Sequence, residues 1–443
     1  MKSVSLQLKN SFIFLCLSAC LIYYFSPKYN SEIFNYIVFF LFSIEIILYF
    51  KLKRKENFWD FDSIFLSVFT ISAFAYPLLI FDESEPFLPF FHLEYNVNDI
   101  SKAVSLSFVA ASFYMLGSLY KKKYTKQNND RKEISINKLV ICILLFTFLF
   151  VLLGGIDYYK ALYDKRVEAS TSGLLLQVQA LLQAMLMSAI GIEFYNIGIR
   201  KRKINRLLLG NIVFIVLIML YAGNRTLVMQ LILPFSFYVT YYFIRISKIK
   251  FLFIIIGGAI LLTTVGLFRN GKEVDTENLE ALTLMRDIVI PARNNYLVFE
   301  VVEKEGHTLG YSMSGGIIGV IPSLERVLKL VGLESDKIGS AILFTKYSLG
   351  DNPSFGVGTM LQADAYLSFG FIGVIIVFFS IGYIADYCYQ LLKNKNVYYF
   401  VFYGTLMAHA VFWVRAEAFY PLRIIIWSLI VTFLTKNMQW KKK

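Results

Sequence analysis

The sequence has little charge and few cysteines, histidines and prolines. Charged residues make up 17% of its 443 residues and hydrophobic residues 57%, with only 4 Cys, 3 His and 9 Pro. A soluble protein this apolar would need an improbably large core. The scarcity of charge therefore argues against a soluble protein and indicates that the chain resides in a membrane.

The few cysteines suggest neither a disulfide framework nor a zinc site. Cys16, Cys20, Cys142 and Cys388 all fall in apolar segments without the spacing of metal ligands, so we expect small buried hydrophobic side chains. A Walker loop, GxGxxG, HExxH and an acidic metal-binding cluster are also missing from the sequence. These absences argue against an ATPase, a zinc protease and a nucleotide-sugar enzyme with a soluble catalytic domain. We expect no metal and no cofactor.

Long apolar runs, by contrast, are abundant. Runs of about 17 to 25 apolar residues predict an all-α polytopic membrane protein with about twelve spans, because each run is long enough to cross a bilayer. The first run could pass for a signal-peptide core, but no small-residue cleavage site follows it, so it is interpreted as the first span. The predicted starts lie near Ser11, Ile33, Phe58, Asp99, Leu139, Gly173, Leu207, Leu227, Phe251, Tyr366, Val397 and Pro421.

Basic residues follow alternate spans. If the N-terminus is cytoplasmic, the even-numbered connections should be rich in Lys and Arg. They are, in residues 51–57, 121–132, 200–206, 245–250, 390–396 and 436–443. We therefore expect both termini in the cytoplasm. The net charge of +13 then reflects orientation and attraction to anionic lipid headgroups, so nucleic acid is not an expected partner.

One connection is much longer than the rest. Spans one to nine are predicted within residues 1–268, a large outer loop within 269–365, and spans ten to twelve with a basic tail within 366–443. Long loops in compact proteins are usually functional. Within this loop we expect an amphipathic helix over about 278–302, and a second amphipathic segment at 324–333.

The outer side carries arginines that the orientation rule does not require. An arginine at the centre of a spanning helix costs roughly 2.5 to 3.5 kcal/mol, while its planar guanidinium can bind a phosphate with two hydrogen bonds. Any one of them can instead be an anchor that extends to the interface. Their number favours an anionic ligand. The arginines are Arg225, Arg269, Arg286, Arg293, Arg415 and Arg423.

Three residues on the outer side are candidates to accept a proton: Asp364 is the first candidate, followed by His307 and Glu417. Each has a simpler interpretation, because an acid in a first turn favours the helix N-terminus and a lone loop histidine is usually solvated. His409, inside span eleven, is expected to be packed and hydrogen-bonded.

The stretch DAYLSFGFIG at the start of span ten (364–373) combines a carboxylate with glycines. We expect Phe369, Gly370 and Gly373 to allow close helix packing beneath a site that contains Asp364.

Three motifs in this order resemble a known family. A small-residue turn with Arg (AGNRT, 222–226) is followed by an Ile-Pro step in the long loop (VIPSLERV, 320–327) and then by DAYLSFGFIG. The arrangement resembles the Wzy-type O-antigen and capsule repeat-unit polymerases of bacterial inner membranes, in which Glu is more frequent at the position of Asp364. The likeness covers about residues 207–425, and the first six spans match only in topology.

The resemblance implies a glycosyltransferase whose active site faces the periplasm. Such an enzyme transfers the growing glycan from undecaprenyl pyrophosphate to the next lipid-linked repeat unit, beside a chain-length regulator and a flippase of the same pathway. Because the lipid pyrophosphate is itself the leaving group, no nucleotide pocket is needed. The arginines would stabilise its charge, and tyrosines such as Tyr296, Tyr366 and Tyr420 would stack on sugar rings.

Two alternatives remain open. An O-antigen ligase uses the same donor and passes the glycan to a lipid A core or to a protein. A flippase or transporter of the lipid-linked repeat would predict charged residues along the middle of several spans, whereas the middle of these spans is mostly apolar. The sequence therefore favours the polymerase over the ligase, and the ligase over a transporter.

Overall fold

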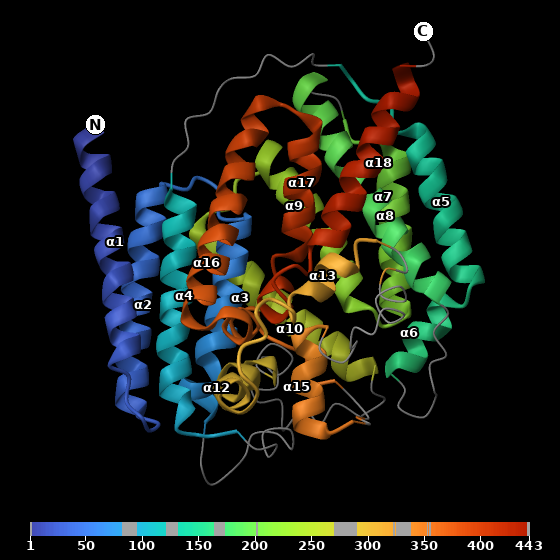
Figure 1. Ribbon diagram of the computed structural model, residues 1–443. Coiled ribbons are helices and arrows are strands. Elements are labelled where there is room, and N and C mark those ends of the chain that lie inside the picture. The colour runs from blue at the N-terminus through green and yellow to red at the C-terminus, as the bar shows by residue number, and fades with distance from the viewer. Residues whose placement is uncertain are drawn as a thin grey trace.

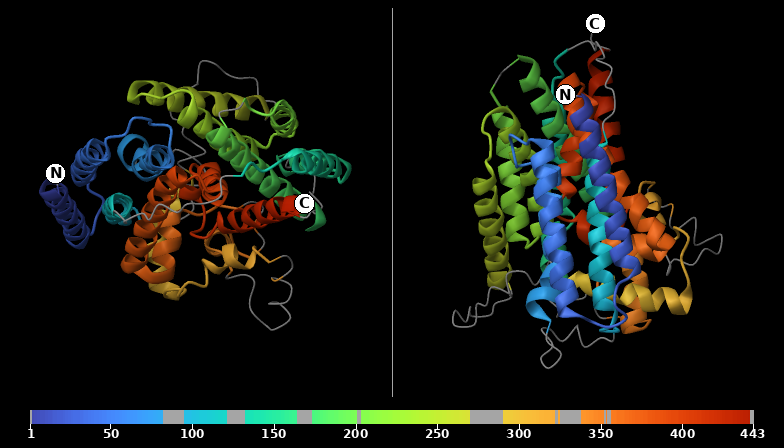
Figure 2. Two further views of the ribbon diagram at one scale, coloured as in Figure 1. Left: turned by 90° about the horizontal axis from the view of Figure 1, so that it is seen from above. Right: turned by 90° about the vertical axis from the view of Figure 1, so that its left-hand side faces the viewer.

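The computed structural model describes residues 2–81, 95–120, 132–163, 173–200, 203–269, 290–321, 324, 338–351, 353 and 356–440. Within these ranges the chain is helical and contains no strand. The long helices run side by side along one axis, and both termini lie at the same end of the bundle (Figures 1 and 2).

A helix corresponds to each of the twelve predicted spans. The helices are α1 (Lys2–Tyr24), α2 (Glu32–Lys53), α3 (Phe61–Ala75, continued by a π-helical turn Tyr76–Ile80), α4 (Asp99–Leu119), α5 (Asn137–Leu152), α7 (Gly173–Arg200), α8 (Arg206–Tyr221), α9 (Arg225–Tyr242), α10 (Lys248–Arg269), α16 (Leu361–Leu391), α17 (Val397–His409) and α18 (Leu422–Trp440). In the described part of the chain, α2, α3 with its π turn, α4, α7 and α16 are long and apolar enough to cross a membrane. For the other helices, crossing remains a prediction.

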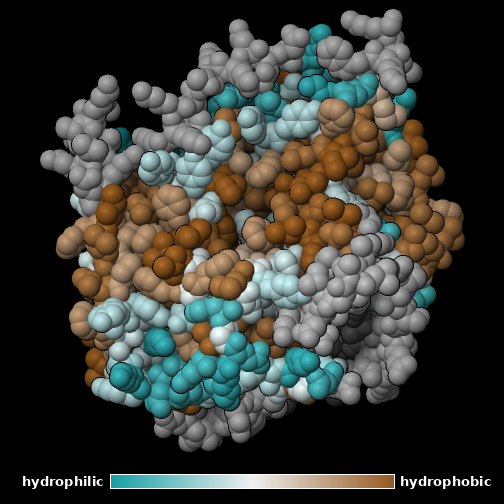
Figure 3. Space-filling view, viewed as in Figure 1, coloured by the Kyte–Doolittle hydropathy of each residue, from teal (hydrophilic) through white to brown (hydrophobic). Residues whose placement is uncertain are grey.

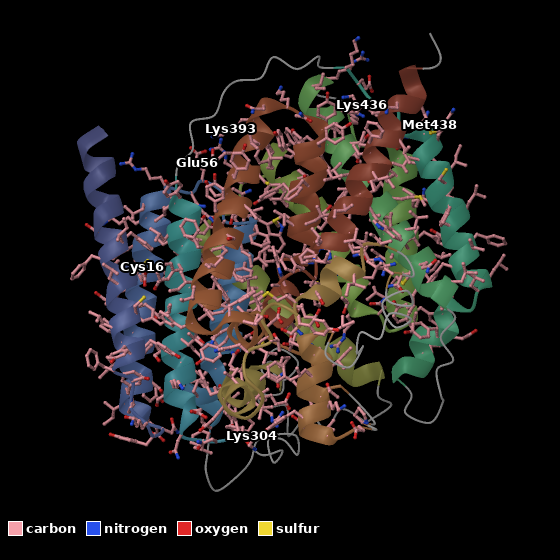
Figure 4. All side chains as sticks on the ribbon, in the orientation of Figure 1. Cys16, Glu56, Lys304, Lys393, Lys436 and Met438 are labelled. Atoms are coloured by element: carbon pink, nitrogen blue, oxygen red, sulfur yellow. The ribbon has the colours of Figure 1, made fainter. Side chains whose placement is uncertain are left out.

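The shorter elements lie between the middle of the bundle and the end opposite the termini, which we call the loop end (Figure 1). They are α6 (Gly155–Tyr163), the 3₁₀ turn η4 (Ile290–Ala292), α12 (Arg293–Glu305), α13 (Ser314–Ile318), α15 (Ser340–Leu349) and the 3₁₀ turn η7 (Trp413–Arg415). Lys304 lies at the loop end, whereas Glu56, Lys393 and Lys436 lie toward the termini (Figure 4). A mostly apolar band separates the polar ends on the face shown in Figure 3. Which end faces the cytoplasm remains a prediction.

The long connection matches its predicted pattern only in part. Helix α12 covers the end of the helix expected at 278–302 and continues to Glu305. The segment predicted at 324–333 lies outside the described residues except for its first residue. Helix α16 begins at Leu361, before the predicted start at Tyr366. The prediction left out Gln362 and Asp364 because they are polar, whereas both are buried in the first turn of this helix.

Helices α4 and α16 pack with their backbones in close contact. A Cβ on Gly382 would lie 2.0 Å from the Tyr114 carbonyl oxygen, and one on Gly117 would lie 2.1 Å from that of Phe379. Glycine at both positions is what allows this approach. These two glycines, on opposite helices, let the backbones of α4 and α16 come into contact.

Lysines predicted as part of the orientation signal are buried in an ion-pair network. Lys53 Nζ lies 2.5 Å from Asp62 Oδ2 and 2.9 Å from Asp386 Oδ1. Lys55 Nζ lies 2.6 Å from Asp60 Oδ2 and 3.2 Å from Asp62 Oδ2. None of these side chains is more than 12% exposed. The network joins α2, α3 and α16 at the end that carries the termini.

The prediction of four buried cysteines is partly wrong. Cys16 and Cys388 are buried, Cys20 is half-buried, and Cys142 is exposed, all as free thiols. Cys142 lies on α5, whose outward side carries exposed Ile141, Leu144 and Leu145. An apolar segment at the edge of a helical bundle exposes one side, so its composition alone did not determine burial.

Candidate functional site

Helix α16 is broken within the motif DAYLSFGFIG. Phe369 (φ −139°, ψ 19°) and Gly370 (φ 62°, ψ −149°) leave helical geometry. The carbonyl oxygens of Leu367 and Ser368 instead accept hydrogen bonds from the backbone N–H groups of Thr308 and Leu309, each at 3.0 Å. The segment after α12 therefore docks onto the break and satisfies groups that would otherwise be unpaired.

The glycines of the motif allow the backbone of α16 to break. The expectation that they mediate packing between helices is therefore wrong. Gly370 has a positive φ that disfavours a side chain. A Cβ on Gly373 would lie 2.4 Å from the carbonyl oxygen of Ala365, which belongs to the same helix. A Cβ on Gly310 would lie 2.9 Å from the Phe369 ring. The motif thus encodes a discontinuous helix.

Asp364 lies in the first half of α16 and is completely buried. Its Oδ2 accepts the backbone N–H of Ala418 at 2.8 Å, and its Oδ1 accepts the Ser312 hydroxyl at 3.3 Å. The Trp413 indole donates to the Ala418 carbonyl at 2.9 Å, so both backbone polar groups of Ala418, in the loop between α17 and α18, are hydrogen-bonded. The carboxylate therefore fixes the loop between α17 and α18.

Glu417 is in that loop and interacts electrostatically with Asp364. Its carboxylate accepts the backbone N–H groups of Ser340 and Ala341 at the start of α15. It also sits beside two glycines, since a Cβ on Gly339 would lie 2.7 Å from Oε1 and one on Gly315 would lie 3.2 Å from Oε2. Burial, and then the charge of Asp364, raise the pKa of Glu417 to about 7, against the two backbone hydrogen bonds. The structure thus joins two of the three predicted proton acceptors.

Arg415 and Tyr420 belong to the same loop and interact electrostatically. From Tyr420, polar side chains lead into the bundle: Gln230 Nε2 donates to the Tyr420 hydroxyl at 3.4 Å, and Gln183 Nε2 donates to Gln230 Oε1 at 2.7 Å. Both glutamines are buried, at 7% exposure or less. The sequence analysis missed them, although an amide inside an apolar span is itself a signal of a polar partner.

His409 packs against Tyr420, with ring centroids 5.4 Å apart. Its Nδ1 lies 2.8 Å from the Thr405 carbonyl oxygen, and the side chain is 1% exposed. The prediction of a packed, hydrogen-bonded histidine is confirmed.

His307 and Tyr366 lie together on another side of α16. Their ring centroids are 6.0 Å apart, and the Tyr366 ring also packs edge-on against Phe299 at 4.9 Å. Residues two apart on a helix point about 200° apart, so Tyr366 faces away from the direction of Asp364. His307 is exposed and lies against Gly370. The structure therefore separates this pair from the two carboxylates.

Three of the remaining arginines lie in the first turn of a helix. Arg225 starts α9, directly after the N-cap Asn224, and is half-buried. Arg423 lies in the first turn of α18 over the Trp427 ring, with its Cζ 4.8 Å from the ring centroid. Arg293 starts α12, is 3% exposed, and donates from Nη1 to the Ser348 hydroxyl at 2.9 Å. The side chain of Arg269 and all of Arg286 lie outside the described residues.

The arrangement suits proton transfer and anion binding. It offers two carboxylates, Asp364 on α16 and Glu417 on a loop that also carries Arg415. The pKa of Glu417 is near neutrality. Across the residues with described positions, no three His, Cys, Asp or Glu side chains are grouped to hold a metal ion.

A comparison with protein families extends the resemblance to almost the whole chain. The model of the family described as O-antigen polysaccharide polymerase Wzy matches residues 8–442. Comparisons with curated proteins and with solved structures gave no match. Because the family match includes the first six spans as well as the motifs at the loop end, the chain belongs to the Wzy family of O-antigen polysaccharide polymerases, which are bacterial membrane proteins of the glycosyltransferase type.

Proposed function

We propose that the protein joins undecaprenyl-pyrophosphate-linked oligosaccharide repeat units into a surface polysaccharide, an O-antigen or a capsule, at the periplasmic face of the inner membrane. The growing glycan is transferred from its lipid pyrophosphate to the non-reducing end of the next lipid-linked repeat. The observation that carries this proposal is the contact between Asp364, on α16, and Glu417, whose loop also carries Arg415.

Glu417 is the general base in this proposal. Its carboxylate takes the proton of the acceptor hydroxyl as the hydroxyl oxygen bonds to the anomeric carbon of the donor glycan. The bond between that carbon and the pyrophosphate oxygen breaks, and its electron pair leaves with the lipid pyrophosphate. Asp364 is a positioning residue, because its hydrogen bond to Ala418 fixes the residue next to Glu417.

The arginines bind the pyrophosphate and the glycan. Arg415 lies closest in sequence to Glu417 and is proposed to stabilise the charge on the leaving pyrophosphate, together with Arg225 and Arg423. Arg269, Arg286 and Arg293 keep their predicted role in binding the pyrophosphate or the glycan. His307 and Tyr366 form a separate contact point, which we assign to the acceptor glycan.

The test is deletion of the gene, followed by gel analysis of the surface glycan. Loss of the polymerase should collapse the ladder to one repeat unit, and the wild-type gene should restore it. If the surface carries no repeat unit at all, the protein is instead a ligase or acts before polymerisation.

Replacing Arg415 by lysine should slow chain extension by about 100-fold, because a planar donor aimed at developing charge is lost while a positive charge remains. The measurement is the rate of polymer formation by the purified protein with lipid-linked repeat units. The control is Arg245→Lys, since Arg245 is 74% exposed in a pair with Glu56. Wild-type rates from the lysine variants of Arg225, Arg415 and Arg423 would refute the proposal that these arginines bind the pyrophosphate.

Replacing Glu417 by glutamine should remove the pH dependence of chain extension. In the wild type the rate should rise with pH through about 7, the pKa of Glu417, because only the ionised carboxylate accepts a proton. The rate of Glu417→Gln should be low and flat.

The same pKa has the opposite effect on stability. Because folding raises it from 4.5 to about 7, the stability contributed by Glu417 is greatest below pH 4.5 and is lost as the pH rises through 7. Stability and rate should therefore change in opposite directions. Glu300→Gln is the matched control, because the Glu300 side chain is 26% exposed and is paired with Lys304. A Glu417→Gln variant that keeps the wild-type pH profile would rule out this base.

A further inference from the structure

The first turn of α12 buries a polar segment. Arg293, Asn294, Asn295 and Tyr296 are exposed by only 3%, 0%, 2% and 1%. Asn294 Oδ1, Asn295 Oδ1 and the Tyr296 hydroxyl have no hydrogen-bond partner. The described residues contain eight buried side-chain atoms of this kind, and three of the eight lie on these consecutive residues. A buried polar atom without a partner costs free energy, so such a group calls for a ligand or ordered water.

The other polar atoms of this turn are held in place. Asn294 Nδ2 donates to the Gly358 carbonyl at 2.9 Å, and Arg293 Nη1 donates to Ser348 on α15. The amide oxygen of Asn294 is therefore fixed in direction, since its amide nitrogen is already bonded. The turn presents oriented acceptors, which is typical of a binding site built before its ligand arrives.

Aromatic rings border the same turn. The Tyr296 ring lies 5.8 Å from that of Tyr76 and 5.5 Å from that of Tyr95, centroid to centroid. The hydroxyl groups of Tyr76 and Tyr95 are 2.7 Å apart. Burial raises the pKa of Tyr296 well above its ordinary value, so its hydroxyl stays protonated and can donate. Amide oxygens, phenol groups and ring faces are gathered here.

We propose that the first turn of α12, together with Tyr76 and Tyr95, is a subsite for a neutral sugar residue of the glycan. Sugar hydroxyls donate to Asn294 Oδ1 and Asn295 Oδ1, and one accepts from the Tyr296 hydroxyl. The apolar face of the sugar ring lies against Tyr95, which is half-buried, whereas the Tyr76 and Tyr296 rings are buried behind it. This inference rests on the proposed function, because it assigns to the glycan a place distinct from that of the pyrophosphate.

Helix α15 fixes where this sugar lies relative to the reaction. Its first turn binds Glu417, and Ser348 near its other end binds Arg293. Eight residues of helix separate Ser340 from Ser348, which is about 12 Å at 1.5 Å per residue. The subsite therefore holds a sugar some units away from the bond being formed, and selects the repeat unit rather than reacting with it.

Tyr296→Phe and Asn295→Leu test the subsite, because each removes an unpartnered atom and keeps most of the side-chain volume. The probe is the lipid-linked repeat unit isolated from a strain without this gene, freed from lipid and pyrophosphate by mild acid. Binding to the purified wild-type protein and to each variant is measured by calorimetry, and thermal unfolding by its midpoint. Tyr347→Phe, at the same end of the molecule, is the control, since the Tyr347 hydroxyl already donates to Glu300.

We expect both variants to bind the freed glycan roughly 3- to 10-fold more weakly, with an unchanged or higher unfolding midpoint, while Tyr347→Phe binds as the wild type does. Unchanged glycan binding with a lower midpoint would mean that ordered water holds these atoms and would overturn the subsite. A wild type that extends chains but does not bind the freed glycan would also overturn it. Failure of the proposed function is distinct, because deletion of the gene would then either leave the polysaccharide ladder intact or remove every repeat unit from the surface.

Discussion

Replacing Lys53 by methionine is expected to destabilise the protein by about 3 to 5 kcal/mol, because it leaves buried carboxylates without their counter-charge. Lys53 lies within 3 Å of both Asp62 and Asp386, and these side chains are at most 12% exposed. The Tyr114 hydroxyl on α4 also donates to Asp62 at 2.6 Å, so a displaced Asp62 would weaken the contact with α4 as well. The measurement is the midpoint of thermal unfolding in detergent.

The matched control is Arg245→Met at the same end of the bundle. Arg245 pairs with Glu56 at 2.5 Å, but the two side chains are 74% and 71% exposed. An exposed ion pair contributes about 0 to 1 kcal/mol, so this variant should unfold close to the wild type. Equal midpoints for the two methionine variants would show that burial of the Lys53 network contributes nothing.

Replacing Gly370 by alanine is expected to shorten the polysaccharide and to destabilise the protein. At φ 62° and ψ −149° a side chain is strained, at about 1 to 3 kcal/mol, and its Cβ would lie 3.1 Å from the His307 ring. To relieve the strain, α16 must change at its break, where Thr308 and Leu309 dock. Asp364 lies only six residues before Gly370, so the loop with Glu417 moves with it.

The matched control is Gly210→Ala on α8. A Cβ there meets nothing within 4 Å and the backbone is helical. Alanine should leave the ladder unchanged and add up to about 1 kcal/mol of stability. A complete ladder and an unchanged unfolding midpoint for Gly370→Ala would show that the break is not needed.

Much of the candidate site could be predicted from the sequence, because charge in an apolar chain is conspicuous. Asp364 and Glu417 were both expected near a site, and the structure places them in electrostatic contact. Their roles could not be predicted, since these depend on which backbone N–H groups each carboxylate accepts. Asp364 accepts from Ala418, 54 residues away in the chain, and no local pattern encodes that contact.

The polar turn of α12 shows the same limit. Its residues, RNNY, are of the types found in any amphipathic helix. The prediction of such a helix did not say that these four side chains are buried. Only the packing of α12 beneath Tyr76 and Tyr95 turns these amides inward. Lys53 is a parallel case, because a lysine in a basic segment is normally solvated until aspartates from other helices surround it.

The sequence by itself determined the class of the protein, the approximate starts of its helices and its family, because apolar length and motif order are properties of continuous segments. The tertiary structure alone decided that Gly370 breaks a helix and does not pack one, that Glu417 is joined to Asp364, and that Lys53 is buried. The physical reason is that a backbone break and a buried charge are both stable only when distant segments supply the missing hydrogen bonds and counter-charges.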